Sequence, residues 1–132
     1  MQLPAEGKTI GMIKGIGIDM IELDRIQHSI QQNKRLAEKI LTDTEKNFFN
    51  TLTNDRRKVE YLAGRFAAKE AFSKAVGHGI GKLSFKNMEV TTDTYGAPVM
   101  NVVGYENENI FISITHSRDY AVAQVVIEET TS

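Results

Sequence analysis

The chain has 132 residues, of which 41% are hydrophobic and 25% charged, and its formal net charge is −1. This length suits one domain, and the composition is that of an ordinary globular protein rather than a disordered or fibrous one. A net charge near zero gives no general attraction to nucleic acid, and the lack of cysteine excludes disulfides, thiolate nucleophiles and cysteine-based zinc sites.

The first eleven residues, MQLPAEGKTIG, have no clear periodicity. We interpret residues 1–11 as a loose extension or an expression scar, and we place the domain at residues 12–132. No apolar run approaches the roughly 20 residues of a membrane helix, and no signal-peptide pattern opens the chain. We therefore expect a soluble, cytoplasmic protein with no membrane partner.

The next part of the chain is predicted to begin with a strand and continue as helices. A β-branched run weakened by glycines predicts a strand that ends near Asp19, and apolar residues from Ile21 onward recur at helical spacing with a break near Asn33. Thr42 and Glu45 have the spacing of a capping box, which predicts a short helix after Thr42.

A long helix is predicted from Asp55 to Val76, about 33 Å at 1.5 Å per residue. Asn54 suits its N-terminal cap and Gly77 its left-handed C-terminal stop. The rest of the chain is predicted to form strands, with a TYGAP turn and a hairpin connection at residues 117–119. Early helices and late strands favour an α+β fold with an antiparallel sheet.

The long helix carries one carboxylate among several cations. Glu70 and Lys74 are one turn apart beside small residues that leave room for a ligand, and Arg65 and Lys69 form a neighbouring stripe. One interpretation is a solvated surface whose cations complement the helix dipole. The other is a polyphosphate site in which the carboxylate holds a divalent cation against phosphate oxygens. The pattern alone leaves both interpretations open.

The glycines after this helix and the acid before it each allow two interpretations. Gly77, Gly79 and Gly81 fit a helix stop with a flexible turn, or backbone that approaches a nucleotide, but they form no P-loop because they follow the helix. Asp19 precedes Glu22 at a spacing that fits a helix cap, whereas its carboxylate also suits a magnesium ligand.

The last predicted strand pair holds two candidate ligand-binding residues. His116 shares an alternating face with Ile110, Ile112 and Ile114, so the default interpretation is a hydrogen-bonded histidine at a strand end. The histidines have no metal-ligand spacing, and no nucleophile elbow is present. We interpret Thr115 and His116 as candidate hydrogen-bonding groups for a ligand.

The first helical region has a local excess of positive charge. Its cations are Arg25, Lys34, Arg35 and Lys39. Such a surface is usually only solvated, but in a chain of near-zero net charge it could instead steer an acidic partner, with an effect that weakens as salt rises.

Three segments together resemble the holo-acyl-carrier-protein synthases, a family of 4'-phosphopantetheinyl transferases. They are GIGIDMIELDRI at residues 15–26, GRFAAKEAFSKAVGHGIG at residues 64–81 and ISITHSRDYAVAQVVIE at residues 112–128. Their order and spacing fit from about Met12 to Glu128, and only the first eleven residues match nothing in the family. The resemblance implies the 4'-phosphopantetheinyl transferase fold, a single domain of helices packed on an antiparallel sheet.

The resemblance also implies the reaction. The enzyme would transfer 4'-phosphopantetheine from coenzyme A to a serine hydroxyl of an apo acyl carrier protein, release adenosine 3',5'-bisphosphate and support fatty acid biosynthesis. Asp19 and Glu70 match the family's Mg²⁺ ligands, and Lys74 matches a lysine that contacts the phosphates. Two bases for the serine proton stay open, namely Glu70 and a metal-bound water.

Further residues receive roles from the same resemblance. The expected nucleotide and phosphate contacts, beside Lys74, are Arg65, Lys69, Gly79, Gly81, Pro98, Thr115 and His116. The family typically forms a homotrimer with active sites between subunits. Its acyl carrier proteins are acidic, which makes Arg25, Lys34 and Arg35 candidate docking residues.

Two functions from other classes compete with this one. A non-catalytic binder of coenzyme A would keep a cationic pocket but form no product and need little magnesium. A structural interaction protein, in which Glu70 and Lys74 are merely paired, would bind no coenzyme A.

Overall fold

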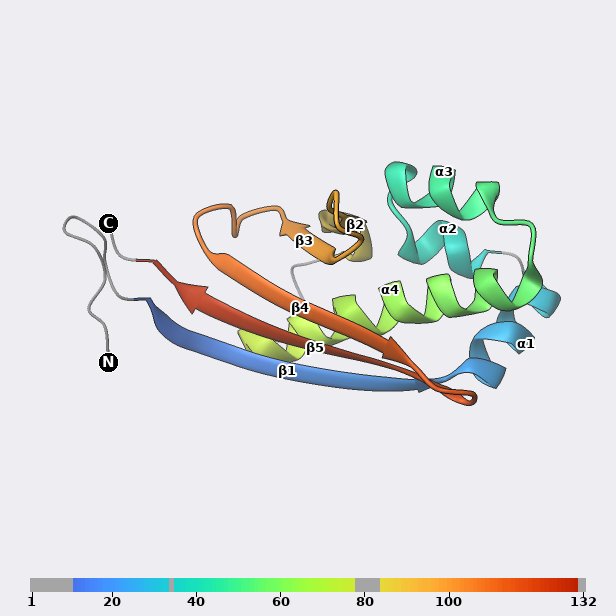
Figure 1. Cartoon of the computed structure of the whole chain (residues 1–132), viewed down its shortest axis with the longest axis horizontal. Coiled ribbons are helices and arrows are strands. Elements are labelled where there is room, and N and C mark those ends of the chain that lie inside the picture. Colours follow the sequence, from blue (N-terminus) through green and yellow to red (C-terminus); the bar gives the residue numbers. More distant parts are fainter. Residues whose placement is uncertain (1–10, 34, 78–83, 131–132) are drawn as a thin grey trace.

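A three-stranded antiparallel sheet and one long helix form the centre of the molecule (Figure 1). A computed structural model of the chain describes residues 11–33, 35–77 and 84–130. The sheet has the order β1-β5-β4, and helix α4 lies on one of its faces. The bounds are Met12–Glu22 for β1, Tyr120–Glu129 for β5, Asn109–His116 for β4 and Asp55–Val76 for α4. The predicted α+β class is confirmed.

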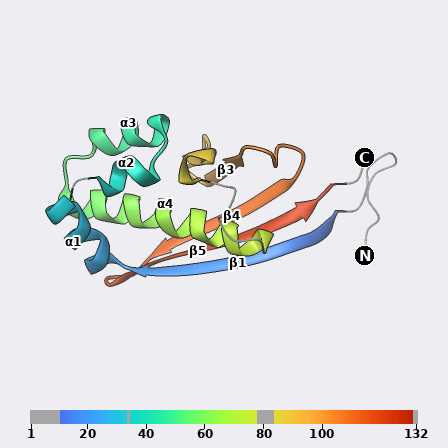
Figure 2. The same cartoon turned by 180° about the vertical axis from the view of Figure 1, so that it is seen from behind.

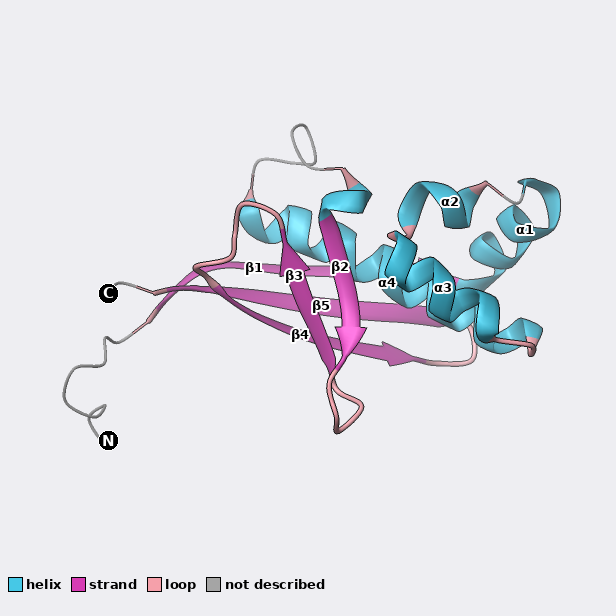
Figure 3. Ribbon diagram, turned by 90° about the horizontal axis from the view of Figure 1, so that it is seen from above, coloured by secondary structure: helices cyan, strands magenta, loops and turns pink. Residues whose placement is uncertain are grey.

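The structure contains a second, two-stranded sheet, whereas the sequence analysis predicted a single antiparallel sheet. It consists of β2 (Met88–Thr92) and β3 (Pro98–Val102), preceded by the 3-10 helix Phe85–Asn87. The hairpin crosses over the large sheet on the side that carries α4 (Figure 3). No helix in the described part of the chain is long and apolar enough to cross a membrane.

Three short helices gather at the end of the molecule where α4 begins (Figure 2). They are α1 (Leu23–Asn33), α2 (Leu36–Ile40) and α3 (Asp43–Thr51). The predicted caps are confirmed: Thr42 and Glu45 form a capping box, and the Asn54 side chain accepts from the Arg57 amide. Gly77 ends α4 with φ 77°, a conformation that glycine adopts without steric cost.

The prediction for the first strand was too short. Strand β1 continues past Asp19 to Glu22, and helix α1 begins only at Leu23. Asp19 is paired with Ala123 of β5 in the middle of the ladder, so it is not a helix cap. The pairing with a strand about a hundred residues later, which local spacing does not reveal, decides where β1 ends.

Two glycines of β1 allow α4 to lie directly on the strand. A Cβ atom at Gly15 would collide with the main-chain oxygen of Ala75, and one at Gly17 with that of Ala71. Ala71 is fully buried and Ala75 nearly so. The glycines were predicted only to weaken the strand, whereas they permit backbone contact between helix and sheet.

The opposite face of the large sheet is left uncovered by the helices and the small sheet (Figure 1). It exposes more than half of the surface of each of four apolar side chains, namely Ile16, Ile18, Met20 and Phe111. Along β1 the exposed apolar side chains alternate with the glycines and Asp19, which face α4, because successive strand residues face opposite sides of the sheet. The sheet thus has one packed face and one exposed apolar face.

Candidate active site

Strand β1 and helix α4 bring Asp19, Glu70 and Lys74 together. Asp19 continues the inward alternation of Gly15 and Gly17, so its carboxylate faces α4. The Lys74 ammonium donates to Asp19 Oδ1 over 2.9 Å and to the main-chain oxygen of Ile18 over 3.1 Å. The Asp19 side chain is only 15% exposed, whereas that of Lys74 is 56% exposed. One chain therefore brings Lys74 into contact with Asp19, and Glu70 lies one turn before Lys74 on α4.

The charges of this cluster interact. Burial raises the pKa of Glu70 above its ordinary value and the nearby Asp19 carboxylate raises it further, while Lys74 opposes both effects. A divalent cation bound by both carboxylates would remove the repulsion between their charges. Magnesium commonly uses one or two protein carboxylates and completes its shell with phosphate oxygens and water, so Asp19 and Glu70 fit it.

The carboxylates alone do not enclose a cation. No group of three histidine, cysteine, aspartate or glutamate side chains that could hold a metal ion occurs among residues 11–33, 35–77 and 84–130. A cation between Asp19 and Glu70 would thus leave coordination positions for substrate oxygens. This open arrangement is typical of catalytic rather than structural magnesium.

A pocket of about 500 Å³ lies on the other side of α4. Helices α3 and α4 and strands β2 and β4 supply its walls, and its lining includes Arg57, Tyr61, Arg65, Thr92 and His116. Asp19, Glu70 and Lys74 do not line it. The two sites therefore use different stripes of the same helix.

Arg65 is a partly buried cation of this pocket. Its guanidinium lies over the Tyr61 ring, 3.9 Å from the ring centroid. Its Nε is buried, and none of the described residues accepts a hydrogen bond from it. Burial lowers the pKa of Arg65, while Tyr61 and Glu45 oppose that shift. A desolvated guanidinium with unused hydrogen-bonding capacity favours an anionic ligand.

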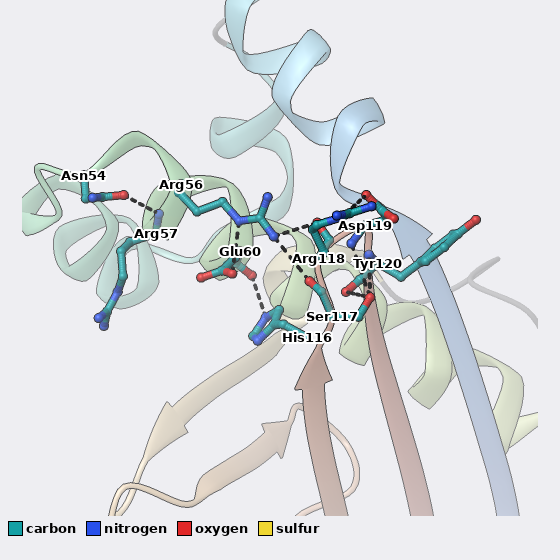
Figure 4. A network of polar contacts seen from close by, with 9 residues as sticks. All are labelled: Asn54, Arg56, Arg57, Glu60, His116, Ser117, Arg118, Asp119 and Tyr120. Carbon is teal, nitrogen blue, oxygen red and sulfur yellow. Dashed lines mark hydrogen bonds and ion pairs between the residues drawn. The ribbon is translucent and has the colours of Figure 1, made fainter.

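His116 reaches the same pocket from the end of β4 (Figure 4). Its Nε2 lies 3.0 Å from the main-chain oxygen of Glu60, which can only accept, so we assign the proton to Nε2. Gly64 leaves room for this approach, because a Cβ atom there would lie 3.2 Å from His116 Nε2, a tight contact. The predicted alternation of His116 with the isoleucines of β4 is confirmed by their inward placement.

A second arginine fixes the turn that follows His116 (Figure 4). Arg56 Nη2 donates to the main-chain oxygens of Ser117 (3.3 Å) and Arg118 (2.7 Å), and its Nε donates to Glu60 (3.2 Å). These contacts attach the β4–β5 connection to the first turns of α4. The contacts of Arg56 with Ser117 and Arg118 were missed in the sequence because these residues lie about sixty positions apart.

The structure contradicts the prediction that Lys69 contacts phosphate. Its side chain has no exposed surface and donates to Glu45 Oε1 (2.6 Å) and to the main-chain oxygen of Ile40 (2.6 Å). The stripe of α4 that carries Arg65 and Lys69 faces α3 and β2, and only its Arg65 end reaches the pocket.

The remaining predicted site residues are distributed as follows. Thr115 lies on the exposed face of the large sheet, opposite to His116, so one chain does not bring the two side chains together. Pro98 begins β3 and is paired with Thr92 of the pocket wall. Arg25 and Arg35 are exposed. Gly79, Gly81 and Lys34 lie outside the described residues.

Sequence reasoning missed Arg57 and Tyr61 as pocket residues. A usable signal was present, because Arg57, Tyr61, Arg65 and Lys69 recur every four residues on one stripe of the predicted helix. The direction of that stripe depended on the positions of α3 and β2, which helix periodicity does not provide.

Comparisons with known proteins agree on one family. The family model of the 4'-phosphopantetheinyl transferase superfamily matches residues 15–125. A holo-[acyl-carrier-protein] synthase of Oceanobacillus iheyensis is 57% identical over 117 residues, which are 89% of this chain and 98% of that protein. A synthase of Staphylococcus aureus is 47% identical over 90% of this chain and 98% of its own length.

Solved structures are similar over nearly the same region. A holo-(acyl-carrier-protein) synthase from Bacillus anthracis, in complex with CoA (3',5'-ADP), is 48% identical with a TM-score of 0.82, over 90% of this chain and 99% of that chain. The Helicobacter pylori synthase in complex with coenzyme A is 33% identical with a TM-score of 0.74, over 85% of this chain and 98% of that chain.

Proposed function

Because this chain belongs to the 4'-phosphopantetheinyl transferase superfamily and is an enzyme of the holo-[acyl-carrier-protein] synthase type, we propose a Mg²⁺-dependent reaction for it. It transfers 4'-phosphopantetheine from coenzyme A to a serine hydroxyl of an apo acyl carrier protein and releases adenosine 3',5'-bisphosphate. The observation that carries this proposal is the convergence of Asp19, Glu70 and Lys74 between β1 and α4. We further propose that the reaction takes place in the cytoplasm and supports fatty acid biosynthesis.

The carboxylates and the lysine have separate tasks. Asp19 and Glu70 hold Mg²⁺, which when bound neutralises pyrophosphate charge and makes the phosphorus more electrophilic. Lys74 pairs with Asp19 in the free chain and is exposed enough to donate to a phosphate oxygen of the donor. Glu70 and a water held by the metal are the two candidates to accept the serine proton.

Arg65 and His116 bind the nucleotide half of coenzyme A in the pocket beside α4. The partnerless Nε and the desolvated guanidinium of Arg65 support an anionic ligand there. The pocket and the metal cluster use different stripes of α4. For this reason we propose that the complete site forms between subunits, with the cluster of one chain facing the pocket of its neighbour.

The exposed face of the large sheet supports association of the chain with further copies of itself, and the proposed number of three subunits comes from the family resemblance. Neighbouring apolar residues cross all three strands there, since Val126 of β5 is paired with both Ile16 of β1 and Phe111 of β4. In the next row Ile18 is paired with Gln124, and beyond it Met20 is paired with Val122. An exposed face that is largely apolar is usually covered by another protein surface, and Thr115 lies on it where a neighbouring subunit would be reached.

The acidic carrier protein docks on the exposed cations near α1. Arg25 lies on α1 and Arg35 just before α2, and both are exposed. Complementary charge accelerates encounter and is weakened by salt. The apparent KM for carrier protein should therefore rise with ionic strength.

The test of function is the intact mass of an apo acyl carrier protein after incubation with this enzyme, coenzyme A and Mg²⁺. We expect a mass gain of one phosphopantetheine unit, and no gain when EDTA removes the metal. The matched control is carrier protein whose acceptor serine is alanine. No gain with several apo carriers, despite coenzyme A binding, would instead favour a non-catalytic binder.

A further inference from the structure

Among the described residues, Glu45 and Lys69 form a fully buried ion pair that the proposed reaction does not use. Lys69 Nζ lies 2.6 Å from Glu45 Oε1, and neither side chain has any exposed surface. Burial lowers the pKa of Lys69, whereas the Glu45 carboxylate raises it. Such a pair is often no more stabilising than apolar residues of the same volume, because both charges lose their hydration. Its presence therefore calls for a reason other than stability.

The pair connects four elements through its hydrogen bonds. Glu45 Oε1 also accepts from the main-chain amide of Thr42 (2.9 Å), and Oε2 accepts from that of Val90 (2.7 Å). The Lys69 ammonium donates to the last residue of α2, the main-chain oxygen of Ile40 (2.6 Å). One carboxylate and one ammonium thus attach the end of α2, the start of α3 and strand β2 to helix α4.

Three of the attached elements, α3, α4 and β2, are walls of the nucleotide pocket. Helix α3 supplies Phe48 and Glu45 itself, strand β2 supplies Val90 and helix α4 supplies Arg65. The Tyr61 hydroxyl donates to the main-chain oxygen of Glu45 (3.2 Å), and Arg65 lies on the Tyr61 ring. A continuous set of contacts therefore runs from the buried pair to the guanidinium that faces the ligand.

We propose that Glu45 and Lys69 are a positioning pair that sets the separation of the pocket walls and the orientation of Arg65. The pair thereby determines affinity for the nucleotide half of coenzyme A, an inference that rests on the proposed function. It does not determine the rate of phosphoryl transfer, because Asp19, Glu70 and Lys74 occupy the other stripe of α4.

Two variants and one control separate positioning from stability. Lys69→Met leaves the Glu45 carboxylate buried and uncompensated, so its thermal midpoint should fall clearly. The double variant Glu45→Gln/Lys69→Met has no unpaired charge, so its midpoint should recover part of that loss. The recovery is incomplete because the glutamine oxygen can replace only one of the two carboxylate oxygens that accept from the amides of Thr42 and Val90. Val125→Ala is the control, because Val125 is fully buried on β5 and does not line the pocket. It lowers stability without changing a side chain that lines the pocket.

The readouts are the Kd of adenosine 3',5'-bisphosphate by calorimetry and the steady-state constants for coenzyme A. For the double variant we expect a Kd and a KM about tenfold higher than in the parent protein, with kcat at saturating coenzyme A within about twofold. Val125→Ala should keep the parent Kd despite its lower thermal midpoint.

Four results would overturn the proposal. They are a double variant that binds the nucleotide as tightly as the parent, a double variant that does not fold, a fall in kcat without a rise in KM, and a Val125→Ala control that loses equal affinity. If the parent protein itself binds no nucleotide, the proposed function fails first, and the parent measurement identifies that case before any variant is compared.

Discussion

Glu70 is the residue whose charge has opposite effects on folding and on the reaction. Its pKa in the folded chain is raised above the ordinary 4.5, by burial first and by Asp19 second. The folded chain therefore holds this proton to higher pH than the unfolded chain does. Without metal, stability that is present below pH about 4.5 is lost as pH rises through the raised pKa.

We expect Glu70→Gln to remove this loss of stability at rising pH. In EDTA at neutral pH the variant should be at least as stable as the parent, and its stability should fall less between about pH 4 and pH 7. Its activity with Mg²⁺ should fall by about 100-fold or more, because one of the two carboxylate ligands is lost. Thermal unfolding over pH and carrier-protein modification measure the two effects.

Glu38→Gln, on the exposed surface of α2, is the control for this substitution and should change neither quantity. A Glu70→Gln protein that retains more than about a tenth of parental activity would remove Glu70 from the metal site.

Residue-scale prediction succeeded where the sequence pattern included the partner and failed where it did not. Thr42 and Glu45 cap α3 as predicted, because both ends of a capping box lie within one turn. The role of Lys69 was predicted wrongly, because the same helical spacing fits a surface lysine and a buried one. In the sequence its partner, Glu45, already has a role in the capping box of α3. Helix periodicity does not show that the same carboxylate also accepts from Lys69.

At the scale of elements, the contact between β1 and α4 decides whether the catalytic cluster forms. Gly17 faces the main chain of Ala71, and a Cβ atom there has no space. Gly64, which precedes Ala71 on α4, faces side-chain atoms of His116 and Ile114 at 3.2 Å, and these can move by a few tenths of an ångström. Replacement of glycine by alanine should therefore destabilise the fold more at Gly17 than at Gly64.

We expect Gly17→Ala to lower the free energy of unfolding by about 2 kcal/mol or more, because helix and strand must separate. The separation also moves Asp19 away from Lys74, so activity should fall with it. Gly64→Ala should stay within about 1 kcal/mol of the parent, since the better helix propensity of alanine offsets the tighter contact. Urea denaturation at equal protein concentration measures both, and equal losses would contradict this account.

The limits of the elements were predictable to different degrees. Helix α4 begins and ends as predicted, because Asn54 and Gly77 signal its ends locally. Strand β1 runs three residues further than predicted, since its pairing with β5 depends on residues near the other end of the sequence. The order β1-β5-β4 likewise follows from pairing over long distances, which strand patterns do not specify.

At the scale of the whole molecule, the exposed apolar sheet face predicts the oligomeric state. Ile18 is 57% exposed at the centre of that face in the single chain. We expect the parent protein to have about three times the chain mass of 14.8 kDa in light scattering after gel filtration. Ile18→Glu should shift it toward a single chain and abolish activity, because the neighbouring pocket is lost.

Val103→Glu is the matched control, since Val103 is 62% exposed but lies outside the large sheet. It should leave both mass and activity unchanged. An Ile18→Glu protein that keeps the mass and the activity of the parent would contradict the proposed assembly.

Helix α4 presents Glu70 and Arg65 on separate stripes, and this division has a genetic consequence. If each reaction centre takes its carboxylate from one chain and its guanidinium from the next, an allele defective at Glu70 and an allele defective at Arg65 encode complementary lesions. Co-expressed, the two products would form mixed assemblies in which some centres combine two unaltered halves. Two inactive alleles would then restore activity together, which a centre contained in one chain does not allow.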